Sequence, residues 1–173
     1  NRLEQTPKLT IAALNGHCVG GGLEIAMACD LRIAKKDGGK LGLPEVHLGV
    51  LPGTGGTQRL VRILGKAKAL LWMATGQRVS FAAGLEAGII QKILDDGDFW
   101  GQATAYAREF CPPNRAAKAV GFIKRSVQSG AEVGFHEGLA LERELQQQLF
   151  QSQDAQEGIA AFVEKRKPDF QGR

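Results

Sequence analysis

The chain lacks any run of apolar residues approaching the roughly 18 that a membrane span needs. It also lacks an internal repeat, a low-complexity tract and a long block of like charge, so repeat architectures are excluded. With 173 residues, 43% of them apolar, and a mean hydropathy of -0.15, the composition is that of an ordinary soluble protein of one domain. No secretory signal peptide is recognised. Because the chain opens on Asn1 instead of methionine, we expect the natural N-terminus to lie further upstream.

Cysteine is scarce, and the three present are Cys18, Cys29 and Cys111, all in apolar surroundings. Their odd number predicts buried free thiols in a reducing compartment. No Cys-x-x-Cys or His-x-x-x-His pairing occurs, so we expect no metal site.

Aromatic residues make up only 6% of the chain, and the net charge of +4 is spread along it, with small basic clusters at residues 35–36 and 164–167. A nucleic-acid interface needs the charge gathered on one face with aromatic partners, so such a partner is disfavoured. The simplest interpretation is a solvated surface. The alternative is a polyanionic small molecule, which a few well-placed cations suffice to bind.

Short apolar runs alternate with helical patterns in the first two-thirds of the chain. Strands are predicted at residues 9–14, 31–34, 41–43 and 88–93. Helices are predicted from the glycines at 20–22 onward, then over residues 57–64, 67–74 and 81–87. In the helix at 67–74, the spacing of an apolar face is shown by Ala67, Leu70, Leu71 and Ala74. This alternation predicts an α/β core.

From about residue 113 the pattern is helical throughout, after a further helix predicted over residues 100–110. A helix is expected over residues 115–127, and two more carry apolar stripes, Leu141-Leu145-Leu149 and Ala155-Ile159-Phe162. Such stripes pack either into the chain's own core or against a neighbouring subunit, and the pattern leaves both open.

Residues 15–24, NGHCVGGGLE, run from a strand through glycines into a helix. The first amides of a helix have no acceptor within it, and the helix dipole makes that end positive. Glycine lets an acyl oxygen approach them closely, so the Gly21 amide is a candidate donor for an oxyanion. Glu24, three residues later, projects from the same end and is placed to move a proton near that acyl group. The alternative is an ordinary glycine-rich turn with a glutamate favoured by the dipole.

Residues 43–53, LPEVHLGVLPG, set Glu45 among apolar residues, prolines and glycines. Desolvation raises the pKa of a carboxyl, so we expect Glu45 to be acid-like. The alternative is a Pro-Glu pair that starts a helix. Neither the glycines at 20–22 nor those at 53–56 form a phosphate-binding loop or a dinucleotide fingerprint.

Residues 12–30, AALNGHCVGGGLEIAMACD, resemble the signature of the enoyl-CoA hydratase family, also called the crotonase family. Residues 41–62, LGLPEVHLGVLPGTGGTQRLVR, are similar to the segment that follows it there, and so are the segments 75–90 and 157–170. The resemblance covers essentially the whole chain, and the combination is highly specific. It favours the functional interpretation of Gly21 and Glu24 over the structural one.

The resemblance implies a crotonase-like fold of the α/β class, in which β-β-α turns form a spiral core. Residues 1–112 are then a partial spiral core that carries the catalytic glutamates. Residues 113–173 are a C-terminal helical region for oligomerisation, into a homotrimer or a hexamer built as a dimer of trimers.

The resemblance also implies the roles of residues. Glu24 is expected to activate a water for attack at the β-carbon of an acyl-CoA thioester, and Glu45 to supply the proton to the α-carbon. The Gly21 amide is expected to bind the thioester oxygen. The expected substrate-binding residues are Gly20, Gly22, Leu43, Pro52, Gly53 and Lys165, the last of these near the CoA phosphates.

The implied activity is reversible hydration of a trans-2-enoyl-CoA to a 3-hydroxyacyl-CoA in fatty-acid or amino-acid degradation. No cofactor is implied beyond the coenzyme A of the substrate, and the implied compartments are the bacterial cytoplasm and the mitochondrial matrix. The alternatives are an enoyl-CoA isomerase, another CoA-thioester enzyme of the family, or a non-catalytic binding module. The presence of both glutamates favours the hydratase.

In the family, the second oxyanion amide and much of the adenine pocket come from an N-terminal region that this chain does not contain. Removing one oxyanion donor costs about 10²–10³ in rate. We therefore predict little hydratase activity for these 173 residues alone.

Overall fold

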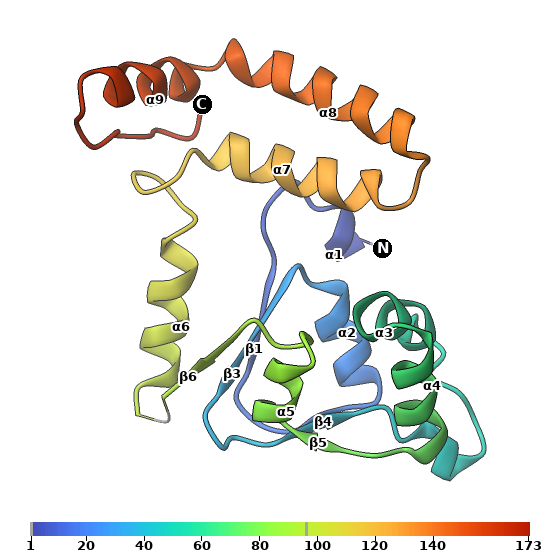
Figure 1. Ribbon diagram of the computed structural model, residues 1–173. Helices are drawn as coiled ribbons and strands as arrows, with labels where there is room; N and C mark the ends of the chain where they lie inside the picture. Colours follow the sequence, from blue (N-terminus) through green and yellow to red (C-terminus); the bar gives the residue numbers. More distant parts are fainter. Residues whose placement is uncertain (1, 96) are drawn as a thin grey trace. The chain divides into compact units, whose positions relative to one another are not determined.

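The computed structural model describes residues 2–95 and 97–173 (Figure 1). It divides into two compact units: Thr10–Ala103 form the first, and Arg2–Leu9 together with Thr104–Arg173 form the second. Asn1, on which the expectation about the N-terminus depends, lies outside the described residues. The division of roles at residue 112 stays a prediction.

Strands of the first unit alternate between two small sheets, so that β1 and β2, and then β3 and β4, lie in different sheets (Figure 1). One sheet is parallel and has the order β1-β3-β6, with strands Ile11–Leu14, Leu31–Lys35 and Lys92–Leu94. The other has the order β2-β4-β5, with strands Cys18–Val19, Lys40–Gly42 and Val79–Ser80; β2 is parallel to β4 and β5 antiparallel to it. Helices follow these strand pairs, which gives the β-β-α succession expected for the core.

The helices of this unit are α2 (Gly21–Ala28), the 3₁₀ helix η1 (Glu45–Leu48), α3 (Gly56–Leu64), α4 (Lys66–Thr75) and α5 (Phe81–Glu86); α6 (Phe99–Arg108) extends past its end. The fully buried large side chains share one core: Leu23, Ile33, Leu41, Leu60, Phe81, Ile89 and Ile90. This core joins α2, β4 and α3, which carry or flank the candidate site residues. The helix predicted to begin at the glycines and the strands predicted at residues 9–14 and 31–34 are confirmed, within two residues at their ends.

The strand predicted at residues 88–93 is wrong in its first half, because only Lys92–Leu94 pair with β3. Gly88 has φ +80° and ends α5. The amides of Ile89 and Ile90 then donate to the Gly84 carbonyl, at 2.9 and 3.1 Å, instead of to a neighbouring strand. These two apolar residues are buried as part of a helix C-terminus, which an apolar run alone does not distinguish from a strand.

The apolar face predicted for α4 is also wrong, although the helix itself is present. Leu70 and Leu71 are 63% and 57% exposed, whereas Ala69 and Trp72 are buried. The indole of Trp72 offers more apolar area than a leucine, and its burial sets the rotation of the helix.

Arg32, the second residue of β3, is buried and acts as a clamp between three segments. Its Nε donates to the Ile89 carbonyl at 2.6 Å, and its Nη1 donates to the carbonyls of Ala26 and Cys29 at 3.2 and 2.8 Å. Ala26 and Cys29 end α2, where a cation is favoured by the helix dipole. The guanidinium thus fixes the C-terminal end of the helix that begins at Gly21.

The second unit is helical: α1 (Arg2–Gln5), α7 (Ala117–Gly130), α8 (Phe135–Phe150) and α9 (Gln153–Val163). α7 and α8 lie side by side (Figure 1). Lys124 of α7 is buried, and its ammonium donates to the carbonyls of Leu3 and Lys8 at 2.9 and 3.0 Å. The helices predicted over residues 115–127 and around the two apolar stripes are confirmed. In the first stripe Leu145 is buried, but in the second Ile159 and Phe162 are 54% and 84% exposed.

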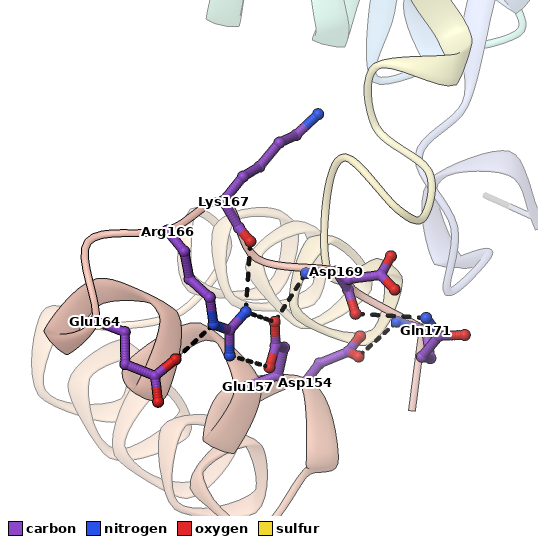
Figure 2. A network of polar contacts seen from close by, with 7 residues as sticks. All are labelled: Asp154, Glu157, Glu164, Arg166, Lys167, Asp169 and Gln171. Carbon is purple, nitrogen blue, oxygen red and sulfur yellow. Dashed lines mark hydrogen bonds and ion pairs between the residues drawn. The ribbon is translucent and has the colours of Figure 1, made fainter.

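A polar network folds the C-terminal segment back along α9 (Figure 2). Arg166 forms a bidentate ion pair with Glu157, at 2.6 and 2.9 Å, and its Nε donates to Glu164 at 2.6 Å. Hydrogen bonding to Arg166 lowers the pKa of Glu157 to about 2. The buried carboxylate of Asp154 accepts the amides of Gln171 and Gly172, both at 2.8 Å. Within the described residues, no helix combines the length and the apolar character that a membrane span requires.

We expect Arg32→Met to lower the free energy of unfolding by about 2–4 kcal/mol, because it leaves several buried carbonyls without a donor. The measurement is chemical denaturation. The control is Arg125→Met, since Arg125 is exposed on α7 and its loss should cost less than about 0.5 kcal/mol. Equal effects of the two substitutions would contradict the clamp.

Candidate active site

The turn between β2 and α2 is built around Gly20, whose φ of 59° and ψ of -132° suit glycine and disfavour other residues. The Gly20 amide donates to the Gly42 carbonyl at 2.9 Å, which fixes the turn to β4. The Gly20 carbonyl accepts the amides of Leu23 and Glu24, at 2.9 and 3.0 Å, as the first hydrogen bonds of the helix. The amides of Gly21 and Gly22 come before those of Leu23 and Glu24 in the chain, at the N-terminus of α2. Both glycines are exposed, and a Cβ at either would meet no atom within 4 Å, so open space lies beside them.

Glu24 lies in the first turn of α2, and only 4% of its surface is exposed. Its Oε1 accepts the amides of Thr54 and Gly56 at 2.8 and 2.7 Å, and its Oε2 accepts the Thr54 hydroxyl at 2.5 Å. Gly56 is the first residue of α3, so the carboxylate sits at the positive end of that helix.

Burial alone would raise the pKa of the Glu24 carboxyl. The hydrogen bonds from the Thr54 hydroxyl and from the amides of Gly56 and Thr54, together with the charge of Arg59, outweigh this effect and lower the pKa below its ordinary value. Glu24 is therefore held as a carboxylate at neutral pH.

Glu45 begins η1 and lies against the same glycine turn. A Cβ added at Gly20 would come 3.1 Å from its Oε1, so Gly20 also leaves room for this carboxyl. The Oε2 of Glu45 is buried and has no hydrogen-bond partner among the described residues. The predicted acid-like character of Glu45 stays a prediction. The two glutamates thus differ in their hydrogen bonding: Glu24 has three donors, whereas one buried oxygen of Glu45 has none among the described residues.

Gly56 marks the point where the loop, α2 and β4 approach most closely. A Cβ there would lie 2.7 Å from Pro52 Cβ, 2.9 Å from Glu24 Oε1 and 3.0 Å from Leu43 Cδ1. The structure therefore brings Leu43 and Pro52 next to Glu24, and both are buried. Gly53 follows Pro52 on the same loop and is exposed.

Lys165 belongs to the second unit, so the structure assigns it no position relative to the two glutamates. It follows α9 with φ +55°, between the two residues of an ion pair, Glu164 and Arg166. Both of these neighbouring residues belong to the network of Figure 2.

Sequence reasoning missed Thr54, Gly56 and Arg59, the residues that hold Glu24. Within the loop at 53–56, the family resemblance implies a role only for Gly53, in substrate binding, and the glycines match neither a phosphate-binding loop nor a dinucleotide fingerprint. The signal that could have found them is general: glycines before a helix leave its first amides open, and a carboxylate in the same chain satisfies them as well as a phosphate does.

The fold and this geometry define a class, an α/β protein with a pair of carboxyl groups at a glycine turn, suited to acid–base chemistry beside an exposed helix N-terminus. A family model described as enoyl-CoA hydratase/isomerase matches residues 1–173, and the chain belongs to that family. Its predicted crotonase-like fold is confirmed by structures of relatives.

Two named relatives and one solved structure illustrate the similarity. A Bacillus subtilis protein named "Probable enoyl-CoA hydratase" is 41% identical over 99% of this chain and 66% of its own length. The 2,3-dehydroadipyl-CoA hydratase of Escherichia coli K12 is 36% identical over 99% of this chain and 66% of its own. A crystal structure of an enoyl-CoA hydratase from Bacillus anthracis matches with a TM-score of 0.91 at 36% identity, covering 99% of this chain and 65% of that one. The chain thus spans just under two-thirds of the length of these relatives.

We expect Gly20→Ala to cost about 2–3 kcal/mol of stability, because the backbone there is unfavourable for alanine and the new Cβ meets Glu45. Gly49→Ala is the matched control: Gly49 also has positive φ, 72°, but its Cβ would meet nothing, so only about 1 kcal/mol is expected. Chemical denaturation of both variants, with and without Glu45→Ala, isolates the contact with Glu45. If Gly20→Ala costs the same in both backgrounds, the close approach of Glu45 is wrong.

Proposed function

We propose that the intact protein adds water reversibly to a trans-2-enoyl-CoA and so forms a 3-hydroxyacyl-CoA. The observation that carries this proposal is the placement of two carboxyl groups at one glycine turn. The amide of Glu24 bonds to the Gly20 carbonyl, and the carboxyl of Glu45 lies against the Gly20 α-carbon. Addition of water across a double bond needs one group that accepts a proton from the water as it attacks one carbon. It also needs a second group that gives a proton to the neighbouring carbon.

Glu24 takes the role of base in this proposal, because its hydrogen bonds favour the ionised form. As the water oxygen bonds to the β-carbon, Glu24 accepts a proton from that water. The electron pair of the double bond takes a proton from Glu45 at the α-carbon. The proton returns from Glu24 to Glu45 before the next turnover, so the enzyme is unchanged.

The amide of Gly21 is the proposed donor to the thioester oxygen, which becomes more negative as the β-carbon is attacked. The exposed position of Gly21 and Gly22 and the open space beside them support this role. Leu43, Pro52 and Gly53 are proposed to contact the acyl group from the side of Glu24. Lys165 is proposed to bind the CoA phosphates, and its exposed position supports this role.

The second unit is proposed to mediate a homotrimer, or a hexamer built as a dimer of trimers. Large apolar side chains are exposed on its helices, including Phe135 at 77% and Phe162 at 84%, and association of subunits through these helices would remove them from water. Sedimentation of the intact protein as a monomer would contradict this. We also propose a reducing compartment, the bacterial cytoplasm or the mitochondrial matrix, in keeping with three free cysteines; the predicted burial holds for Cys18 and is wrong for Cys111, which is exposed.

An isomerase is the second candidate, since the family description covers hydratases and isomerases. Moving a double bond needs a proton to be removed from one carbon and returned to another, which a single carboxylate can do in turn. A hydratase instead needs both glutamates at the same time. The two activities therefore respond differently to loss of one carboxylate.

We expect Glu24→Gln and Glu45→Gln each to lower kcat for hydration of a trans-2-enoyl-CoA by about 10²–10⁴, because each removes a proton-transfer group. The measurement is steady-state kinetics with the intact protein. Glu86→Gln, on the exposed surface of α5, is the control and should leave kcat unchanged.

If one glutamine variant kept the rate of the parent protein, the paired mechanism would be excluded and isomerisation favoured. If the intact protein turned over no thioester and instead bound RNA with a steep salt dependence, a binding module would replace the enzyme.

A further inference from the structure

Glu24 is held by two kinds of donor that differ in what they require of the sequence. The amides of Thr54 and Gly56 bind Oε1, and any non-proline residue at position 54 supplies the first of them. The hydroxyl of Thr54 binds Oε2, and only a hydroxyl-bearing side chain at that position supplies it. The identity of residue 54 therefore determines the surroundings of one oxygen of the carboxylate and leaves the other unchanged.

The two oxygens also differ in which can carry a proton. An amide only donates, so a proton on Oε1 would face two N–H groups and displace them. A hydroxyl both donates and accepts, so the Thr54 hydroxyl can turn and accept a hydrogen bond from a protonated Oε2. The proton that Glu24 receives during turnover therefore belongs on Oε2.

Thr54 is itself held in place. Its carbonyl accepts Arg59 Nη1 at 3.0 Å, and its amide is bound to Glu24. The contact between Thr54 Oγ1 and Oε2, at 2.5 Å, lies in the short range typical of a hydroxyl bound to a carboxylate.

We propose that Thr54 is a positioning residue that makes Oε2 the reacting oxygen of Glu24 and stabilises its ionised form between turnovers. The consequence for catalysis rests on the proposed hydratase function. The consequence for the ionisation of Glu24 does not, because it follows from the hydrogen bond alone.

Other charged and titratable groups lie on the elements that contact α2, which are α3, β2 and β3, and on η1. α3 supplies Arg59, whose charge lowers the pKa of Glu24, and η1 supplies Glu45. β2 supplies Cys18, and burial raises the pKa of its thiol to about 11, so it stays neutral. β3 supplies Arg32, bound at the far end of α2. The Thr54 hydroxyl is the largest of the effects that lower the pKa of Glu24.

The test compares Thr54→Val, which keeps the shape and removes the hydroxyl, with Thr54→Ser, which keeps the hydroxyl. The first readout is titration of the Glu24 carboxyl by ¹³C NMR in the intact protein without substrate, assigned with Glu24→Gln. We expect Thr54→Val to raise the pKa by about one unit and Thr54→Ser to restore it. Thr57→Val, in the first turn of α3, is the control; the Thr57 hydroxyl accepts from Gln58 and should not affect Glu24.

The second readout is the pH profile of kcat/KM. A base with a raised pKa is protonated at higher pH, so the acidic limb should move up by about one unit in Thr54→Val. Well below that limb, the variant should then be about tenfold slower than the parent protein.

An unchanged titration of Glu24 in Thr54→Val would overturn the inference, and so would a raised pKa that Thr54→Ser fails to restore. A parent protein without hydratase activity would instead overturn the proposed function, while the titration would still decide the role of Thr54.

Discussion

The carboxylate of Glu24 joins two helices that are otherwise separated by 27 residues of sequence between α2 and α3. It starts in the first turn of α2 and ends on the first amide of α3, at Gly56. This contact depends on glycine at position 56, because Pro52, Leu43 and the carboxylate itself occupy the space that a Cβ would need. The same contact places the loop 52–56 beside the Gly20 turn. Once it is made, the positions of β4, the loop and the start of α2 relative to each other are fixed.

The pair of glutamates gains its different characters from this arrangement. Glu24 is buried among donors that favour negative charge, and Glu45 approaches from η1 with a buried oxygen that has no donor among the described residues. One turn of backbone, at Gly20, is in contact with both. A glycine with positive φ is what permits this, since the residue must bend the chain sharply and also leave room for the Glu45 carboxyl. Glycine at position 20 therefore accounts both for the sharp turn of the backbone and for the close approach of the Glu45 carboxyl.

The sequence predicted those parts that depend on local physics. The glycines at 20–22 followed by a helical pattern fixed the start of α2, and hence the exposure of Gly21 and the position of Glu24. What it did not predict depends on contacts distant in sequence. The rotation of α4 is set by Trp72, and no local pattern shows that Trp72 outweighs Leu70 and Leu71. The strand predicted at 88–93 failed because Gly84 and Gly88 direct the amides that follow them back to α5. The donors to Glu24 were missed because they lie about 30 residues further along the chain.

In the proposed mechanism Glu24 accepts a proton from the water that attacks the β-carbon, and Glu45 gives a proton to the α-carbon, so both carboxyl groups must face one bound thioester. A crystal structure of the intact protein with a bound acyl-CoA thioester tests this arrangement. We predict an ordered water within hydrogen-bonding distance of Glu24 and next to the β-carbon, with Glu45 at the α-carbon and the thioester oxygen at the Gly21 amide. A thioester bound away from the Gly20 turn, or one whose reacting carbons face only one of the two carboxyl groups, would contradict it.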